Sequence, residues 1–305
     1  MKRLIRSKRA VGFWFILPAV LLTSTIFLVP FYRAFDTSLH RLLLYRPSRT
    51  AFIGFDNYWR LLSRDEAFRN SVVLTAIFVV ATVILVLFVA SLISGLLVRN
   101  RVRKGYSAVA DKYQIVLLLP FLMTPAVSGT IFRVFIWDYD TGIANWLLRS
   151  VGLPRIEWLT NPEMAMVAII FTEVWAHVPL AVLILFSAMK SSPRQPYEAA
   201  MLDGAGLWQQ FLHVTLPYVR PQLVFVSIMQ LTLSFRQFEL IFLITGGGPG
   251  SSTKLLTLNI FEKGMEDLNL GYANATGILS LVLVGVITAV IITGFSRTEE
   301  VSWEK

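Results

Sequence analysis

Long runs of apolar residues, separated by polar segments, make up most of this 305-residue chain. The runs cover residues 11–34, 71–98, 113–136, 164–189, 221–244 and 268–296. Because about 20 consecutive apolar residues are enough for an α-helix to cross the hydrocarbon core of a bilayer, each run predicts one membrane-spanning helix. The pattern therefore predicts an all-α membrane protein, with six transmembrane helices in a single domain over residues 1–305.

The composition agrees with a membrane location. Hydrophobic residues make up 55% of the chain and charged residues only 15%, whereas charged residues make up roughly 25% of a soluble domain. The absence of cysteine excludes disulfides, thiolate catalysis and cysteine-ligated metal sites. The three histidines, His40, His177 and His213, share no metal-ligand spacing. We therefore expect no metal site and no cofactor bound by this chain.

The net charge of +9 comes from Lys and Arg residues that cluster beside the apolar runs. Lys2, Arg3 and Arg6 precede the first run, and residues 99–112 form a densely basic loop. Such clusters are typical of cytoplasmic loops that face anionic lipid, and nothing in their placement favours a nucleic-acid partner. The first run is also longer than a signal-peptide core. We therefore expect an uncleaved first helix and both termini in the cytoplasm.

Two segments expected on the outer side favour short helices. Residues 54–59 combine turn residues with an aromatic stretch and suit a small lid or interfacial helix. Residues 138–161 contain Gly142, Gly152 and Pro154, and a short helix is expected there at residues 143–149.

The cytoplasmic segment 190–220 is polar and itself has the pattern of a helix. Ser192 and Pro193 suit an N-cap and a first helical position. Glu198 then falls near the first turn, where a carboxylate meets the positive end of the helix dipole. The small residues that follow would allow another protein to approach the backbone closely. This segment therefore predicts a docking element.

At these residues the sequence resembles the cytoplasmic "EAA" signature of binding-protein-dependent ABC importer permeases. The signature is Glu-Ala-Ala, three residues, Gly, nine residues, Ile, one residue and Leu-Pro. Glu198, Ala199 and Ala200 are followed at that spacing by Gly204, and Val214 replaces the Ile. The resemblance implies that these residues couple the chain to an ATPase: Glu198, Ala199, Ala200, Asp203, Gly204, Ala205, Leu216 and Pro217.

A second resemblance lies at Thr245-Gly246-Gly247-Gly248-Pro249, which is similar to the Leu-Thr-Gly-Gly-Gly-Pro segment of carbohydrate-type permeases, with Ile244 in place of the Leu. Trp175 and Pro179 also fit that subfamily. Together the two resemblances cover roughly residues 170–280. They imply a permease of the maltose or glycerol-3-phosphate type. They leave open whether the solute is a disaccharide, a monosaccharide, a polyol or a glycerol phosphate.

The resemblance also implies an assembly. A second homologous permease would complete the pore, an extracytoplasmic solute-binding protein would deliver a sugar-like small molecule, and two cytoplasmic ATPase subunits would hydrolyse ATP with Mg²⁺. The chain has no phosphate-binding loop with a Gly-Lys-Ser/Thr end. We therefore expect a transport subunit without an ATPase site of its own, embedded in the inner membrane.

Polar side chains inside the apolar runs are candidates to line the solute path, because charges at this depth usually face a bundle interior or a watery cavity. Trp175, and also Trp137, would add an aromatic face for a sugar ring. The candidates are Glu173, Trp175, His177, Gln230, Arg236 and Glu239.

An alternative is that Glu173 pairs with His177, and Arg236 with Glu239, for structural reasons only. A proton-coupled secondary transporter would use Glu173, His177 and Glu239 as a relay, but it gives no reason for the long cytoplasmic segment. An integral membrane enzyme lacks any constellation of nucleophile and base in this sequence.

Overall fold

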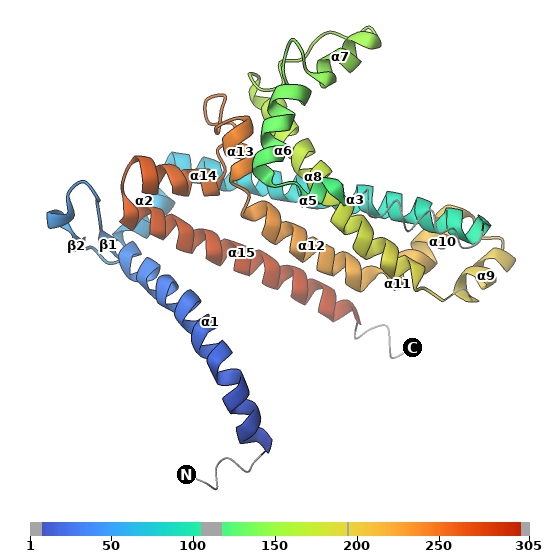
Figure 1. The fold of residues 1–305 in the computed structure, drawn as a ribbon, viewed down its shortest axis with the longest axis horizontal. Helices are drawn as coiled ribbons and strands as arrows, with labels where there is room; N and C mark the ends of the chain where they lie inside the picture. Colours follow the sequence, from blue (N-terminus) through green and yellow to red (C-terminus); the bar gives the residue numbers. More distant parts are fainter. Residues whose placement is uncertain (1–7, 105–117, 194, 300–305) are drawn as a thin grey trace. The chain divides into compact units, whose positions relative to one another are not determined.

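The computed structural model describes residues 8–104, 118–193 and 195–299. Helices make up nearly all of its regular structure (Figure 1), which confirms the all-α class. Within these ranges four helices are long and apolar enough to cross a membrane. They are α1 (Lys8–Ser38), α3 (Glu66–Lys104), α8 (Pro162–Lys190) and α15 (Leu270–Glu299). The basic residues 2–6, Lys112 and the start of the third apolar run, 113–117, lie outside the described residues.

The third and fifth apolar runs do not form the continuous helices that the sequence predicts. The third run contains α5 (Leu119–Leu122), α6 (Pro125–Ile131) and the π-helix η3 (Phe132–Ile136). The fifth contains α12 (Arg220–Phe235) and α13 (Glu239–Ile244), separated by three residues.

The two breaks have different causes. In the third run, Pro125 holds Thr124 in an extended conformation, as expected for a residue before proline, and the Thr124 side chain caps α6. The fifth run contains no proline at its break. There the Gln237 carbonyl accepts a hydrogen bond of 2.7 Å from the Thr257 hydroxyl. This tertiary contact replaces the backbone hydrogen bond that the carbonyl would accept in a continuous helix.

The contacts divide the chain into two compact units. The first comprises Met1–Arg69 and Asn259–Val282. In it α1 leads into a short antiparallel hairpin of β1 (His40–Arg41) and β2 (Ala51–Phe52). The buried Asn57, in α2 (Asp56–Ser63), holds the hairpin by donating to the carbonyls of Ser38 and His40. The expected short helix after residue 54 is therefore confirmed.

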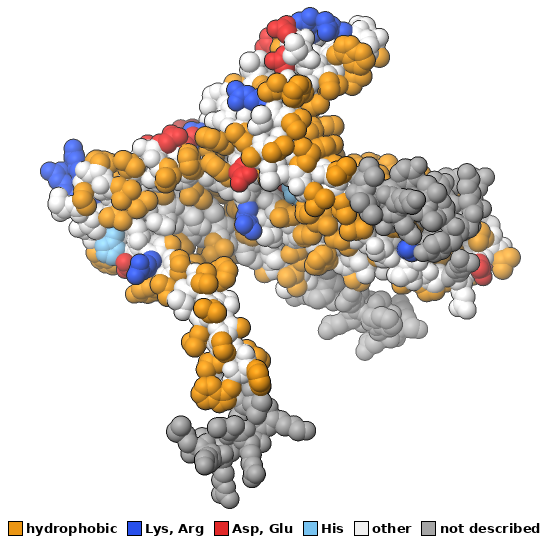
Figure 2. Space-filling view, viewed as in Figure 1, with side chains coloured by type: hydrophobic (Ala, Val, Ile, Leu, Met, Phe, Trp, Pro, Cys, Tyr) orange, Lys and Arg blue, Asp and Glu red, His pale blue; other side chains and the backbone are white. Residues whose placement is uncertain are grey.

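Helix α1 buries little of its apolar surface. Phe15 is 81% exposed and Phe27 is 67% exposed, and Figure 2 shows hydrophobic side chains over most of the visible face of α1. Such a surface suits lipid or the helices of another subunit rather than water.

The second unit comprises Asn70–Leu258 and Leu283–Lys305. Its core lies between α3, α8 and α12, where residues such as Val86, Leu185 and Val226 are fully buried. Helix α6 packs closely on α13 because Gly129 has no side chain; a Cβ there would lie 3.3 Å from Leu243 Cβ. The opposite ends of α8 lead to α7 (Ile143–Ser150) and to the polar segment at residues 190–220 (Figure 1).

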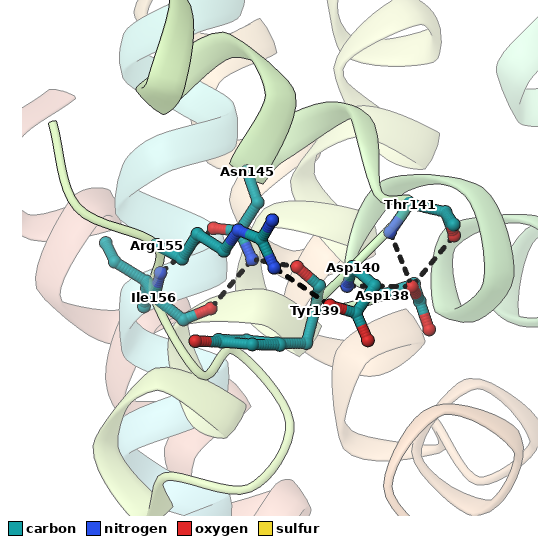
Figure 3. Close-up of polar contacts among 7 residues, drawn as sticks. All are labelled: Asp138, Tyr139, Asp140, Thr141, Asn145, Arg155 and Ile156. Carbon is teal, nitrogen blue, oxygen red and sulfur yellow. Dashed lines mark hydrogen bonds and ion pairs between the residues drawn. The ribbon is translucent and has the colours of Figure 1, made fainter. Parts of the chain in front are cut away.

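Residues 138–161 form a hydrogen-bonded lobe that contains α7 and confirms the short helix expected there (Figure 3). The fully buried Asn145 is at its centre. Its amide nitrogen donates to the carbonyls of Tyr139 and Ile156, both at 3.0 Å. Its oxygen accepts from the Ile156 N–H at 2.9 Å and from the Trp158 indole at 3.2 Å. One side chain therefore ties α7 to the loops that precede and follow it.

A second set of contacts closes the loop before α7. Oδ1 of Asp138 accepts from both the backbone and the side chain of Thr141, each at 2.8 Å, and from the Asp140 backbone at 3.0 Å (Figure 3). The hydrogen bond from the Thr141 backbone is the main reason that the pKa of Asp138 is lowered, because it stabilises the carboxylate form. Arg155 donates to Asp140 at 2.8 Å and lies over the Tyr139 ring.

Replacing Asn145 with Ala should loosen the lobe. The change removes four hydrogen bonds and leaves buried backbone groups unpaired, which costs about 3 kcal/mol. We expect trypsin to cleave at Arg149 and Arg155 at least roughly ten times faster in the purified variant. Ser150→Ala, at an exposed position of the same helix, is the control. Equal cleavage rates in Asn145→Ala and Ser150→Ala would contradict this account of the lobe.

Candidate functional site

The polar segment at residues 190–220 is built from short helices. They are α9 (Gln195–Leu202), α10 (Leu207–Gln210), the π-helix η4 (Phe211–Thr215) and α11 (Leu216–Tyr218). Glu198 lies in the first turn of α9, as predicted. The prediction that Ser192 and Pro193 begin this helix is wrong. The Ser192 hydroxyl instead donates to the Met189 carbonyl at the end of α8, at 2.7 Å.

Gly204 ends α9 in a Schellman turn. Its N–H donates to the Met201 carbonyl at 3.1 Å, and the Ala205 N–H donates to the Ala200 carbonyl at 2.9 Å. The φ of Gly204 is +76°, a conformation that favours glycine. An added Cβ would meet nothing within 4 Å. The glycine is therefore needed for the turn, and the space beside it is open on this chain.

Side-chain contacts attach α9 to its neighbours. The Tyr197 hydroxyl lies 3.0 Å from Thr215 Oγ1 in η4 and accepts from the Ser192 hydroxyl, just after α8, at 3.5 Å. The Tyr218 hydroxyl of α11 also donates to the Ser191 carbonyl at 3.4 Å. Leu216 and Pro217, the end of the signature, form α11, which leads directly into α12. A displacement of α9 would therefore be passed both to α8 and to α12.

Large apolar side chains project from this segment. Leu202 is 89% exposed, and Met201, Leu207 and Trp208 are also more than half exposed. Trp208 stacks on Phe211 with ring centroids 5.8 Å apart. Exposed apolar side chains gathered on one polar segment are typical of a protein–protein contact.

A second candidate site is a buried polar network centred on Glu173. This residue lies about 17 Å along α8, a helix about 43 Å long, and it is fully buried. Its Oε2 accepts from the Gln237 amide at 2.6 Å, and its Oε1 accepts from the Ser234 hydroxyl at 3.3 Å. His177 Nδ1 lies 3.0 Å from the Glu173 backbone carbonyl and 3.3 Å from Oε1. Because a carbonyl only accepts, Nδ1 carries the hydrogen.

The network extends to two further helices. The Gln230 amide donates to Ser234 Oγ at 2.8 Å, and Thr82 Oγ1 of α3 lies 3.0 Å from the same oxygen. Gln237 lies in the break of the fifth run, and its carbonyl accepts the hydrogen bond from Thr257. The Glu173 carboxylate thus connects α8 to α12 and to the break, and the Ser234 hydroxyl connects α3 to them.

The structure brings together only some of the predicted path residues. Glu173, His177 and Gln230 belong to the network, whereas Arg236 and Glu239 are exposed. Among the described residues no ion pair joins Arg236 to Glu239, so the structural pairing considered for them is not present. Gln230 is fully buried, whereas Glu239 is exposed, so these two predicted path residues do not line one surface.

The two candidate aromatic faces also differ from the expectation. Trp175 is half-buried and packs on Phe132, with ring centroids 4.8 Å apart. Trp137 is only 5% exposed, and its indole donates to Thr172 Oγ1 at 3.1 Å. In this structure Trp137 therefore has no open face for a sugar ring.

Sequence reasoning missed Ser234 and Gln237. Both are uncharged polar residues in an apolar run, and the spacing of four between Gln230 and Ser234 was a usable signal. Gln237 had no such signal, because its role depends on the helix break.

The family described as "Binding-protein-dependent transport system inner membrane component" matches residues 88–298. The chain belongs to this family. It is therefore a multi-pass protein of the inner membrane, and the proton-coupled carrier considered above is not supported.

Individual relatives of this transport-system component match over nearly its full length. It is 31% identical to the trehalose/maltose transport system permease protein MalF of Thermococcus litoralis, over 92% of each chain. It is also 31% identical to the sulfoquinovosyl glycerol transport system permease protein SmoG of Agrobacterium fabrum, over 90% of this chain and 86% of that protein. A solved bacterial ABC transporter that imports the acidic polysaccharide alginate shares its fold. The TM-score is 0.77 at 22% identity, over 95% of this chain and 96% of the other.

Removing the Glu173 carboxylate should destabilise this inner membrane component. In Glu173→Ala the Gln237 amide and the Ser234 hydroxyl lose their acceptor in a buried site, which costs about 3 kcal/mol. We expect a clearly lower melting temperature in detergent. Glu163→Gln, at an exposed position of the same helix, is the control and should melt like the parent protein. The network would not hold these helices together if both variants melted alike.

Proposed function

We propose that this chain is the membrane-spanning subunit of an ATP-driven importer for a sugar or sugar-like solute. The observation that carries the proposal is the cytoplasmic segment, where signature residues, a glycine-ended helix and exposed apolar side chains occur together in a member of this family. The relatives that transport trehalose/maltose and sulfoquinovosyl glycerol support the sugar class. ATP and Mg²⁺ bind to two cytoplasmic ATPase subunits, and this chain has no ATPase site of its own.

In this assembly the termini and α9 face the cytoplasm. A second homologous permease completes the pore, and an extracytoplasmic solute-binding protein delivers the solute. A solved alginate transporter in complex with its alginate-bound periplasmic protein supports the last partnership by analogy. Closure of the ATPase dimer displaces α9 as a rigid body, and Leu216 and Pro217 transmit the movement to α12.

The solute path runs beside the break between α12 and α13. Exposed charges at this depth are costly if they face lipid, so Arg236 and Glu239 face water or a partner subunit along the path. Their neighbours Phe238 and Phe242 stack with ring centroids 5.4 Å apart and offer aromatic surface near these charges. Glu173, His177 and Gln230 form the wall behind them, and Trp175 adds an aromatic surface on α8.

Uptake experiments test the energy source. The complete importer is reconstituted in vesicles, and the solute is the one found on the co-purifying binding protein. We expect import to continue in the presence of a proton uncoupler and to stop when ATP inside the vesicles is replaced by a non-hydrolysable analogue. Import that the uncoupler abolishes while ATP is present would rule out this function.

Substitutions at the break test the path. Arg236→Gln and Glu239→Gln should each raise the apparent Michaelis constant for uptake about tenfold, because each removes one charge-assisted hydrogen bond to solute. Arg149→Gln, in the outer lobe, is the control and should leave uptake unchanged. An unaltered Michaelis constant in both path variants would show that these charges do not contact solute.

A further inference from the structure

Helix α2 presents a stripe of large apolar side chains on its exposed side. Phe55, just before the helix, is 68% exposed, Trp59 is 66% exposed and Leu62 is 58% exposed. Their spacing of four and three residues places them on one face of a helix. Another face of α2 is fixed inside the first unit, where Asn57 and Leu61 are buried. The stripe therefore cannot turn inward and is left for a partner outside the described part of the chain.

A hydrogen bond places the start of α2 at the end of a spanning helix. The Asn57 amide donates to the carbonyl of Ser38, the last residue of α1, at 2.7 Å. The candidate span of α1, Trp14–Ser38, contains 25 residues and is about 37 Å long. This length exceeds the hydrocarbon core of about 30 Å, so a span centred in the bilayer ends among the lipid headgroups. Only Arg64 and Asp65 separate the other end of α2 from α3, the next spanning helix. Both ends of α2 are therefore held at headgroup depth.

The loops around the stripe are rich in arginine. Residues 39–65, which lie between α1 and α3, contain five arginines, no lysine and two aspartates. All five arginines are exposed, and within the described residues none of them forms an ion pair. One of the aspartates, Asp65, already accepts hydrogen bonds from the Phe68 N–H and the Tyr272 hydroxyl. A guanidinium can bind a phosphate through two parallel hydrogen bonds, which an ammonium does not match. The arginines are Arg41, Arg46, Arg49, Arg60 and Arg64.

We propose that α2 is an interfacial anchor for anionic phospholipid. Phe55, Trp59 and Leu62 enter the boundary between headgroups and acyl chains, and the arginines beside them bind lipid phosphate. Trp suits this depth because its ring is apolar while its N–H is polar. Helices that combine such residues with arginine are typical of the membrane surface. Lipid is favoured over a soluble partner because both ends of α2 are held where lipid already surrounds the protein.

The choice of leaflet rests on the proposed function. In the orientation proposed above, residues 39–65 lie on the outer side, so the anchor binds the outer leaflet. Lys and Arg are normally scarce in short outer loops, because they act against the orientation of the chain. Five arginines in this loop therefore need a role other than topology, and binding to lipid phosphate supplies one.

The absence of cysteine allows the contact to be measured directly. Leu62→Cys, at an exposed position, is labelled with monobromobimane in the purified full-length chain, which is then reconstituted in vesicles. The vesicles contain phosphatidylcholine with the same small fraction of either brominated phosphatidylglycerol or brominated phosphatidylcholine. We expect both to quench the label. We expect the anionic lipid to bind at this site about fivefold more tightly, because each arginine near the surface adds to its attraction.

Arginine variants separate the charge from the apolar contact. Adding Arg60→Gln and Arg64→Gln to the labelled chain should remove most of the preference for the anionic lipid and leave quenching by phosphatidylcholine unchanged. Arg149→Gln, in the outer lobe, is the control and should preserve the preference. Absence of quenching, or equal affinity for the two lipids in the chain that carries only Leu62→Cys, would overturn the inference.

The same label tests for a protein partner. When the labelled chain is assembled into the complete importer, with or without its solute-binding protein, the label should still be quenched. Loss of quenching there would show that another subunit covers the stripe in place of lipid, and the inference would fail. Because quenching does not depend on transport, each of these results leaves the proposed function intact, and a failure of ATP-driven uptake would not alter them.

Discussion

A polar group inside the hydrocarbon core must find its partner within the protein, because the core contains no water to replace it. Glu173 is the clearest case in this chain. Its carboxylate is fully buried in α8 and accepts hydrogen bonds from Ser234 and Gln237. These two contacts connect α8 to α12 and to the break that follows it. The arrangement of α3, α8 and α12 in the second unit depends on this requirement.

The break between α12 and α13 is a consequence of the same constraint. Backbone that leaves the helical pattern at membrane depth needs substitute hydrogen bonds, and the Thr257 hydroxyl supplies one to Gln237. The break places Arg236 and Glu239 on the surface of the unit instead of in its core. A chain that must pass a polar solute through a bilayer can use such a point, because polar side chains become accessible there without disturbing the apolar faces of the longer helices.

At the end of α8 that leads to α9 the constraint is a different one. The segment that begins at α9 consists of short helices that expose large apolar side chains, which is typical of a protein–protein contact. Within this segment the Tyr197 hydroxyl joins α9 to η4, and the Tyr218 hydroxyl joins α11 to the end of α8. The segment is therefore suited to move as one body with the helices that surround the Glu173 network.

The sequence alone predicted the all-α membrane class, which the structure confirms, and a helix at α9 with Glu198 in its first turn. Apolar runs of sufficient length predict helices because helix length and bilayer thickness are related by simple geometry. The signature around Glu198 and Gly204 could be identified because its residues are close together in the chain. Only the tertiary structure decided which polar residues meet. Gln237 reaches Glu173 across 64 positions, and Trp137 is buried by aromatic neighbours. The sequence around the helix break at Arg236 contains no proline or glycine from which the break could be predicted. It depends on hydrogen bonds between distant segments, which periodicity and composition do not record.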